Sequence, residues 1–408
     1  MPAQPRVLVV GASLAGLRSA EQLRSAGHTG PITVVGAEPY LPYNRPPLSK
    51  DVLADQRATT AADLAGRLAF RRRASTADVE FRLGEPVASA DLADGVLVTV
   101  AGRSLSYDGL VVATGLRPRR LAVPGPLDGR HVLRTVEDCQ ALREAILTRP
   151  QHVVVIGAGF IGCETAATLR SLGHAVTVIE PAGPPMARVV GATLAAAVQR
   201  HHERTGIRFV IGAGVIAFTG TDRLTGVLLD TGEEIPADVV VEAVGSVCNT
   251  EWLAGNGLDL SDGVLTDNQL HTGSARPTVA TGDIVRFPNP LFDDTPRRVE
   301  HWSTPTDTAK RAAATLVALL AGEEPAPVVF APVPSFWSDQ GDLRFQSFGS
   351  PALGDEVRVE EGNPEHLAGG LLATYHHAGR HLGTLAINLT ADRQRELRAA
   401  FAAPVPTV

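Results

Sequence analysis

Two segments of the chain repeat one pattern, and this repeat limits the possible folds more than any other feature of the sequence. In each segment an apolar run precedes a glycine-rich turn, a stretch of helix-forming residues, a second apolar run and a glutamate. The first copy starts at residues 7–16 and ends at Glu38, and the second starts at residues 153–162 and ends at Glu180. The pattern is typical of the βαβ unit that opens a doubly wound parallel sheet. The sequence therefore predicts an α/β fold with two Rossmann-like units.

Both turns have the spacing of a dinucleotide-binding fingerprint. Its glycines permit a tight turn and let pyrophosphate approach the backbone at the N-terminus of the following helix. Ser13 stands where the middle glycine of the first turn is usual, which leaves less room beside a phosphate. Two such turns predict two bound dinucleotides. The turn residues are Gly11, Ser13, Leu14, Ala15 and Gly16 in the first copy and Gly157, Gly159, Phe160, Ile161 and Gly162 in the second.

The glutamates that end the two copies lie at about the distance from the first glycine expected for a carboxylate that accepts from a ribose 2′-hydroxyl. A carboxylate repels a 2′-phosphate, so Glu180 favours NADH over NADPH. Arg188, eight positions later, is the residue that would meet such a phosphate. One dinucleotide can deliver a hydride and the other receive it, which points to an oxidoreductase that uses a flavin and a nicotinamide.

Composition limits the class of protein and its setting. A chain of 408 residues with 44% hydrophobic and 20% charged residues is typical of a globular enzyme of two or three domains. No apolar run reaches the roughly 18 to 20 residues that span a bilayer. The start lacks the pattern of a secretory leader, so we expect a cytoplasmic protein. The net charge of −7 argues against nucleic acid as a partner. The oligomeric state stays open.

The cysteines are few and scattered. Cys139, Cys163 and Cys248 form no CxxC pair, which argues against both a disulfide framework and a metal site. Cys163 falls inside the second fingerprint, where we interpret it as a small packing residue rather than a redox group.

Shifts in composition predict the domain organisation. A stretch rich in proline and glycine at residues 117–129 marks a crossing between domains, and a proline-rich joint at residues 323–334 marks another. Between them, residues 277–283 have the pattern of a last parallel strand that returns to the first sheet. We therefore expect an FAD-binding domain of residues 1–116 and 240–322, an NAD-binding domain of residues 117–239 and a smaller α+β domain of residues 323–408.

Two further segments predict contacts with a flavin. Residues 39–50 contain four prolines and two tyrosines, a composition too rigid for a helix, and we interpret them as a loop that covers the cofactor. The strand at residues 277–283 ends in Gly282 and Asp283. Ligands of open α/β sheets bind at the carboxyl ends of the strands, so the Asp283 carboxylate is placed to meet a ribityl hydroxyl or the pyrophosphate.

Taken together, residues 11–16, 42–50, 113–115, 282–283, 298–302 and 336–340 give the chain a specific set of motifs. The whole chain resembles the FAD-dependent ferredoxin reductases that serve cytochrome P450 monooxygenases and ring-hydroxylating dioxygenases. The resemblance implies that NADH reduces bound FAD and that an iron-sulfur ferredoxin then receives single electrons and supplies an oxygenase. Asn44 and residues 246–249 depart from the family's usual residues, and both departures bear on nucleotide affinity.

The same resemblance implies site residues. Lys50 would lie at the reactive edge of the flavin, paired with Glu164, and these two are the candidate catalytic residues. The resemblance places Glu164 and Gly245 at the NAD site. The FAD-site residues it implies, besides those of the first fingerprint and Glu38, are Arg45, Pro46, Lys50, Ala113, Thr114, Gly115, Gly282, Asp283, Glu300, His301, Trp302 and Trp337.

Other activities remain alternatives at this point. A disulfide reductase or an NADH oxidase would need a cysteine near the flavin, and residues 40–51 contain none. A flavoprotein monooxygenase would hydroxylate a small molecule without a ferredoxin. A redox-sensing flavoprotein similar to apoptosis-inducing factor would act chiefly by binding partners.

Overall fold

The computed structural model describes residues 4–57 and 59–402. Residues 1–3, which belong to the segment where we expect no secretory leader, lie outside the described residues. The chain forms two compact units, each assembled from three stretches of sequence. The first unit comprises Met1–Asn44, Ala65–Arg117 and Val247–Pro334, and the second comprises Arg45–Leu64, Pro118–Ser246 and Ser335–Val408. Elements at the crossings are α3 (Ala61–Leu68), β8 (Leu116–Pro118) and β17 (Ser246–Cys248).

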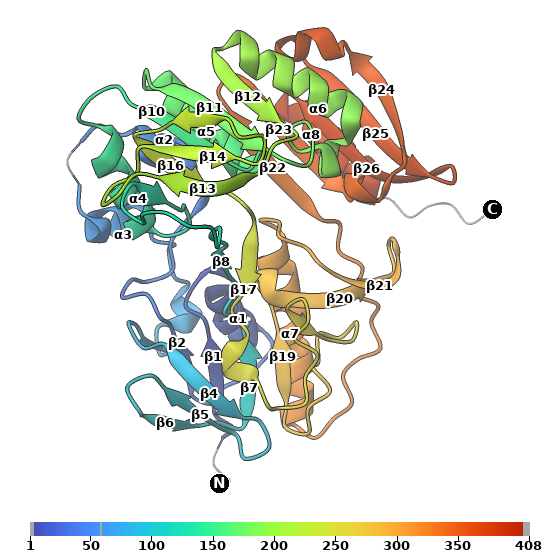
Figure 1. Cartoon of the computed structure of the whole chain (residues 1–408). Coiled ribbons are helices and arrows are strands. Elements are labelled where there is room, and N and C mark those ends of the chain that lie inside the picture. Colours follow the sequence, from blue (N-terminus) through green and yellow to red (C-terminus); the bar gives the residue numbers. More distant parts are fainter. Residues whose placement is uncertain (1–3, 58, 403–408) are drawn as a thin grey trace. The chain divides into compact units, whose positions relative to one another are not determined.

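The first unit is built on a five-stranded parallel sheet with the order β19-β7-β1-β2-β3 (Figure 1). Every residue of β1 and β7 is buried, because both faces of a central parallel strand are covered. The strand order reverses between β1 and β7, where ligands of doubly wound sheets bind. The strands are β1 (Val7–Val10), β2 (Ile32–Val35), β3 (Glu80–Arg82), β7 (Gly109–Val112) and β19 (Thr278–Ala280).

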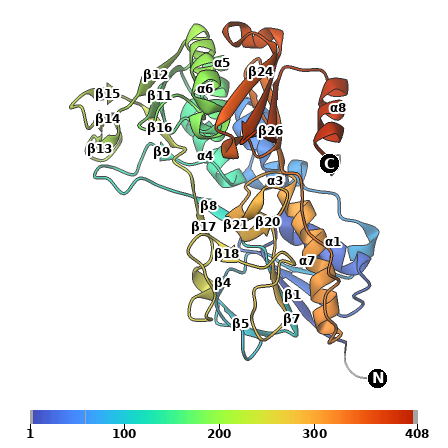
Figure 2. The ribbon, with the colours of Figure 1, turned by 90° about the vertical axis from the view of Figure 1, so that its right-hand side faces the viewer.

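Two helices of the first unit pack against each other and against this sheet (Figure 2). α1 (Leu14–Ser25) contacts β1 and β2, while α7 (Thr304–Leu320) contacts β7 and β19. α1 ends where Gly27 takes a φ of +93°, a left-handed conformation that favours glycine after a helix. The smaller elements of this unit are β4 (Val87–Asp91), β5 (Val96–Thr99), β6 (Ser104–Ser106), β18 (Val264–Leu265), β20 (Val285–Asn289), β21 (Asp293–Arg298), η2 (Ala74–Thr76), η3 (Glu251–Leu253) and η4 (Gly282–Ile284).

The second unit repeats this architecture with the parallel order β12-β11-β10-β16-β9 (Figure 1). Its strand order reverses between β10 and β16. The strands are β9 (Arg130–His131), β10 (His152–Ile156), β11 (Ala175–Glu180), β12 (Ile207–Ile211) and β16 (Val239–Glu242), and the helices are α4 (Val136–Ile146), α5 (Phe160–Ser171) and α6 (Ala187–Arg204). Its other elements before the C-terminal sheet are η1 (Pro46–Ser49), α2 (Asp51–Ala54), β13 (Val215–Thr219), β14 (Gly226–Leu229) and β15 (Glu234–Pro236).

An antiparallel sheet with the order β22-β23-β26-β25-β24 completes the second unit. Its first strand, β22, alternates strictly, with Phe336, Ser338 and Gln340 buried on one side. Contacts join β22 to α5. The elements are β22 (Ser335–Gln340), β23 (Leu343–Gly349), η5 (Pro351–Leu353), β24 (Glu356–Gly362), η6 (Pro364–Gly369), β25 (Leu371–His377), β26 (Arg380–Ile387) and α8 (Ala391–Ala402).

The predicted α/β class, with two Rossmann-like sheets and a smaller α+β part, is confirmed. The compact units group the chain differently from the three domains expected, since residues 45–64 belong to the second unit together with most of residues 323–408. The segment at residues 39–50 is not wholly a loop, because Pro46–Ser49 forms the 3-10 helix η1. Proline is tolerated in the first turn of a helix, where no backbone donor is needed.

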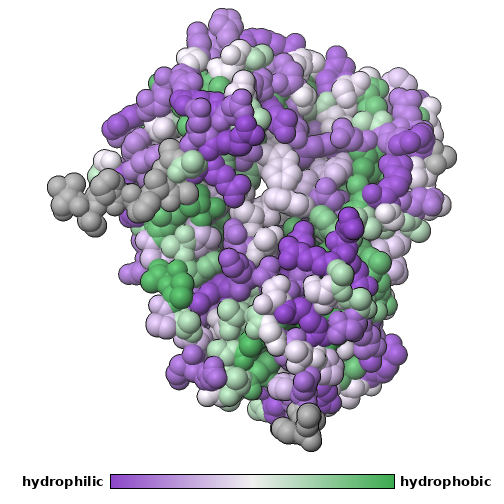
Figure 3. Space-filling model, turned by 180° about the vertical axis from the view of Figure 1, so that it is seen from behind, coloured by the Kyte–Doolittle hydropathy of each residue, from purple (hydrophilic) through white to green (hydrophobic). Residues whose placement is uncertain are grey.

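The surface of the molecule carries both hydrophilic and hydrophobic residues. On the face shown in Figure 3, hydrophilic residues prevail and hydrophobic residues form smaller areas among them. No helix within residues 4–57 and 59–402 is long and apolar enough to cross a membrane.

Candidate functional site

The first glycine-rich turn has no room for side chains at two positions. A Cβ at Gly11 would lie 2.1 Å from the Ala113 carbonyl oxygen, and one at Gly16 would lie 1.8 Å from the Gly11 carbonyl oxygen. Gly11 also has a φ of +119°. Ser13 is the N-cap of α1, and its side chain makes no capping hydrogen bond. The helix N-terminus is therefore presented without a side-chain cap, an arrangement that fits a bound pyrophosphate.

Other predicted residues of the first unit lie around this turn. Gly282 follows β19, and a Cβ there would lie 2.7 Å from the Ala15 Cβ. Its backbone N–H donates to Thr308 Oγ1 at 3.0 Å. The structure thus brings the end of β19, with Gly282 and Asp283, to the start of α1. Thr114, two residues after β7, donates from Oγ1 to the Asn249 carbonyl oxygen at 2.7 Å.

Glu38 follows β2, as the repeat predicts. The Tyr43 hydroxyl, whose residue is 4% exposed, donates to Glu38 Oε2. Tyr43 lies in the proline-rich segment at residues 39–50, so this segment fixes the orientation of the carboxylate. Each oxygen of a carboxylate accepts more than one hydrogen bond.

Glu300, His301 and Trp302 precede α7, which starts at Thr304 with Ser303 as its N-cap. They therefore lie in the turn before the helix rather than on its first residues. Arg298 Nη1 lies 2.8 Å from Glu300 Oε1. The Trp302 ring packs on the Phe70 ring with centroids 6.0 Å apart.

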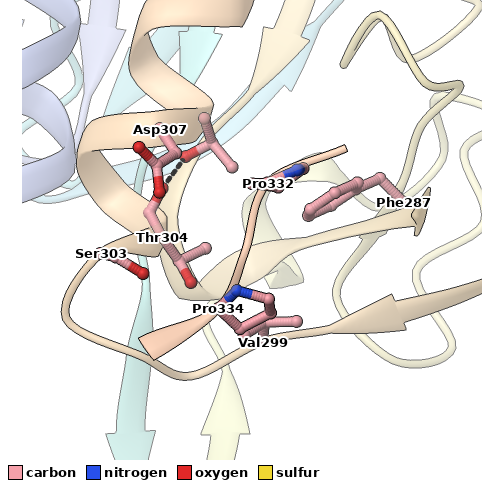
Figure 4. Close-up of a pocket in the computed structure, with 8 residues that line it drawn as sticks. Phe287, Val299, Ser303, Thr304, Asp307, Pro332 and Pro334 are labelled. Carbon is pink, nitrogen blue, oxygen red and sulfur yellow. Dashed lines mark hydrogen bonds between the residues drawn. The ribbon is translucent and has the colours of Figure 1, made fainter. Parts of the chain in front are cut away.

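A small pocket lies at the start of α7 (Figure 4). Ser303, Thr304 and Asp307 contribute the helix side of it, and Figure 4 shows proline and aromatic side chains opposite. The Thr308 hydroxyl donates back to the Thr304 carbonyl oxygen at 2.5 Å, so it is held within the helix. The remaining lining residues are Phe287, Val299, Pro332 and Pro334.

The second fingerprint repeats the geometry of the first. A Cβ at Gly157 would lie 2.3 Å from the Ala243 carbonyl oxygen, and one at Gly162 would lie 2.0 Å from the Gly157 carbonyl oxygen. A Cβ at Gly159 would meet no atom within 4 Å. Gly159 is the N-cap of α5 and offers no side-chain cap. The open space beside it fits a phosphate that approaches the backbone.

Glu180 ends β11 and is held by the backbone. Its Oε2 accepts from the Ala158 N–H and its Oε1 from the Ala182 N–H, each at 2.9 Å. This fixes the carboxylate beside the fingerprint turn, where the sequence predicts a nucleotide ribose. Arg188 is exposed in the first turn of α6, and Gly245 has a φ of +90° with no atom within 4 Å of a Cβ.

Of the two remaining fingerprint residues, Phe160 packs on Phe336 with ring centroids 4.7 Å apart. Ile161 is 48% exposed. Trp337 is half-buried on β22 and, by alternation along the strand, faces away from Ser338.

The implied ion pair is present in the second unit. Lys50 Nζ lies 2.6 Å from Glu164 Oε2, with the side chains 15% and 7% exposed. Ser49 Oγ donates to the same oxygen at 2.6 Å, and Ser338 Oγ donates to Glu164 Oε1 at 2.7 Å. Arg45 is the N-cap of η1, whose first residue is Pro46, and its Nη1 donates to the Arg134 carbonyl oxygen at 2.9 Å. Sequence reasoning assigned no role to these two serines, although they lie in the motif segments 42–50 and 336–340.

The cysteines are not poised for thiolate chemistry. Cys163 is 1% exposed, and burial raises the pKa of its thiol. Burial also raises the pKa of Cys139 to about 12 and that of Cys248 above its ordinary value. All three thiols are free, and no group of three His, Cys, Asp or Glu side chains in the described part of the chain could hold a metal ion.

Comparisons with known proteins agree with this geometry. Residues 5–309 match the family described as pyridine nucleotide-disulphide oxidoreductase. The probable ferredoxin reductase CtmF of Castellaniella defragrans is 36% identical over 380 residues, covering 92% of this chain and 88% of that protein. Putidaredoxin reductase CamA of Pseudomonas putida is 31% identical, covering 88% and 83%.

A solved ferredoxin reductase has a fold similar to that of this chain. The ferredoxin reductase for the CYP199A2 system of Rhodopseudomonas palustris superimposes with a TM-score of 0.85 at 35% identity, covering 96% of this chain and 93% of that one. The matches with CtmF and with this solved structure cover 92% and 96% of the chain. The chain therefore belongs to the pyridine nucleotide-disulphide oxidoreductase family, as a relative of the ferredoxin reductases of oxygenase systems.

Proposed function

We propose that the chain is an FAD-dependent ferredoxin reductase that oxidises NADH and passes single electrons to an iron-sulfur ferredoxin, which supplies a cytochrome P450 or another oxygenase. The names of its relatives support this function, since they include the ferredoxin–NAD(+) reductase component of a biphenyl dioxygenase system and the ferredoxin reductase for the CYP199A2 system. The observation that carries it is the buried pair of Lys50 and Glu164 in a chain whose residues 40–51 contain no cysteine. A disulfide reductase would need a thiol there.

The first unit would hold FAD. When bound, FAD supplies the conversion of a hydride donor into a source of single electrons. The α1 N-terminus would bind the pyrophosphate, Glu38 would accept from the ribose, and Asp283 would hold a polar group of the ribityl chain. The other residues of this unit that we assign to FAD are Gly11, Ser13, Leu14, Ala15, Gly16, Ala113, Thr114, Gly115, Gly282, Glu300, His301 and Trp302. Our assignment to FAD also includes Arg45, Pro46, Lys50 and Trp337, which belong to the second unit.

The second unit would hold NADH. The α5 N-terminus would bind the pyrophosphate beside Gly159, and Glu180 would accept from the ribose 2′-hydroxyl. A carboxylate at this position disfavours a 2′-phosphate, which supports NADH over NADPH. The other residues we assign to NADH are Gly157, Phe160, Ile161, Gly162, Glu164, Arg188 and Gly245.

Lys50 and Glu164 would act at the reacting groups. The Lys50 ammonium would stabilise negative charge that develops during hydride transfer, an electrostatic effect that is strong where water is excluded. Glu164 would hold Lys50 in place. We keep the domain division of residues 1–116 and 240–322, 117–239 and 323–408 as part of the proposal, together with a cytoplasmic setting.

The test is a reductase assay with and without a ferredoxin. The purified protein, loaded with FAD, is given NADH or NADPH and cytochrome c as the final acceptor. We expect cytochrome c reduction to require an added iron-sulfur ferredoxin and to prefer NADH. No ferredoxin-dependent rate with ferredoxins of several cluster types would rule out the proposed function, and equal rates with NADPH would rule out the role of Glu180.

A further inference from the structure

A row of buried polar side chains in the second unit ends at the pair of Lys50 and Glu164. Ser338 and Gln340 come from β22, and His202 comes from α6. Gln340 Nε2 donates to Ser338 Oγ at 3.1 Å, and His202 Nε2 lies 2.9 Å from Gln340 Oε1. Ser338 is 0% exposed, and Gln340 and His202 are each 1% exposed. The row is thus continuous from His202 to Glu164 and is closed to solvent.

The hydrogen bonds of this row run in one direction. Gln340 Nε2 also lies 3.3 Å from Met186 Sδ, and because a thioether only accepts, the amide nitrogen must be on that side. Gln340 Oε1 then faces His202, whose Nε2 must carry a proton in order to donate. Ser338 Oγ accepts from Gln340, so its single proton goes to Glu164 Oε1. Each group donates to the next, and Glu164 is the last acceptor.

Stability alone does not explain why β22 carries these residues. The strand buries Phe336, Ser338 and Gln340 on one side, and two of these three are polar. Polar groups in a core cost free energy unless every one is hydrogen-bonded, and apolar residues of similar size are often as stable or more so. A fully bonded polar row fixes geometry, and the geometry it reaches is that of the Glu164 carboxylate.

We propose that Ser338, Gln340 and His202 are positioning residues that orient the Glu164 carboxylate toward Lys50. Rotation of a carboxylate about its last bond is nearly free, with broad and roughly two-fold minima. The row holds Oε1 at Ser338, which leaves Oε2 to face Lys50 Nζ and Ser49. The proposal rests on the proposed function, since it concerns hydride transfer to FAD at Lys50.

A double-mutant cycle tests whether Ser338 acts through Lys50. Stopped-flow reduction of the bound flavin by saturating NADH is measured in the parent, Ser338→Ala, Lys50→Met and the double variant. We expect Ser338→Ala to slow reduction roughly tenfold, because a small misplacement of a catalytic group costs up to about a hundredfold. In the Lys50→Met background we expect Ser338→Ala to change the rate less than about twofold, since both changes disable one unit.

Ser347→Ala is the matched control. Ser347 lies in β23 of the same sheet and is 0% exposed, and its hydroxyl has no hydrogen-bond partner among the described residues. We expect this variant to reduce its flavin at the parent rate. An equal slowing by Ser338→Ala in the parent and in Lys50→Met would overturn the proposal, as would a normal rate in Ser338→Ala.

The protonation of His202 gives a readout that does not depend on activity. Nitrogen NMR of histidine-labelled protein, with and without FAD, identifies which ring nitrogen carries the proton, and a His202→Asn variant assigns the signal. We expect the proton on Nε2 in the parent, and loss of this single form in Gln340→Met, which keeps the length of the side chain but removes its acceptor. A proton on Nδ1 in the parent would overturn the proposal. The NMR measurement needs no ferredoxin, so failure of this proposal and failure of the proposed function can be distinguished.

Discussion

A methyl group added at Gly162 and one added at Gly159, both in the second glycine-rich turn, should have opposite effects on stability. A Cβ at Gly162 would lie 2.0 Å from the Gly157 carbonyl oxygen, whereas one at Gly159 would have no neighbour within 4 Å. Gly159 also has a φ of −74° and a ψ of −176°, angles that any residue adopts. We therefore expect Gly162→Ala to strain the protein and Gly159→Ala to be accommodated.

The sizes of these effects follow from the geometry. Carbon and oxygen atoms normally stay about 3.3 Å or more apart, so the methyl group of Gly162→Ala requires α5 to move by more than about 1 Å. Overpacking costs about 1–3 kcal/mol, and since the opposing atom here is backbone we expect the upper value. For a unit of this size, about 3 kcal/mol lowers the Tm by roughly 6–12 °C. Gly159→Ala restricts the unfolded chain and should add about 0.4–1 kcal/mol of stability.

The affinity for NADH should follow the opposite order, with the larger loss in Gly159→Ala. The space that Gly159 leaves open is where we place the pyrophosphate, so a methyl group there should raise the Kd for NADH by about tenfold, or roughly 1.4 kcal/mol. Thermal melts and titration with NADH are measured on both variants. An equal loss of Tm in the two variants, or unchanged NADH affinity in Gly159→Ala, would refute this reasoning.

Three further predictions concern single side chains. Glu180→Gln should lower the ratio of kcat/KM for NADH over NADPH by roughly tenfold or more, since a hydrogen bond to a charged group contributes about 1.5–3 kcal/mol; an unchanged ratio would place specificity elsewhere. Glu242→Gln should cost about 3–5 kcal/mol in urea unfolding, because it leaves the guanidinium of Arg130, 3% exposed, without its carboxylate; the exposed Glu251→Gln is the control and should cost less than about 1 kcal/mol. Burial lowers the pKa of His202, so the unfolded chain takes up a proton here that the folded chain does not, and stability is lost as the pH falls below about 6.5. His202→Phe should therefore show a shallower fall of the unfolding midpoint between about pH 7 and pH 5 than the parent, and an identical fall would contradict this.

Much of the fold could be predicted from sequence because its signals are local. Each fingerprint is a contiguous string, and its glycines are required by contacts within a few residues or with the neighbouring strand. The helix α6 shows the limit of such signals. Its residues Ala187–Arg204 comprise two helical stretches joined by a kink at Gly191, whose φ of 78° and ψ of 160° are not helical.

The buried row could not be predicted in the same way. Ser338 meets Glu164 across 174 positions of sequence, and His202 meets Gln340 across 138. A serine on an alternating strand has the same local pattern whether its hydroxyl faces a carboxylate or, like that of Ser347, has no hydrogen-bond partner within residues 4–57 and 59–402. Only the packing of β22 against α5 distinguishes the two cases, and that packing follows from the whole second unit.

The late position of β19 in the sequence affects the order in which the two parallel sheets can be completed during synthesis. Gly282, which closes against Ala15, is synthesised long after β16, the last strand needed by the second parallel sheet. A growing chain can therefore complete the second parallel sheet before the first parallel sheet receives β19, while the antiparallel sheet of the second unit is synthesised later still. Gly282 and Asp283, which we assign to FAD, are thus synthesised about 270 residues after the first fingerprint, although that fingerprint is the first to emerge.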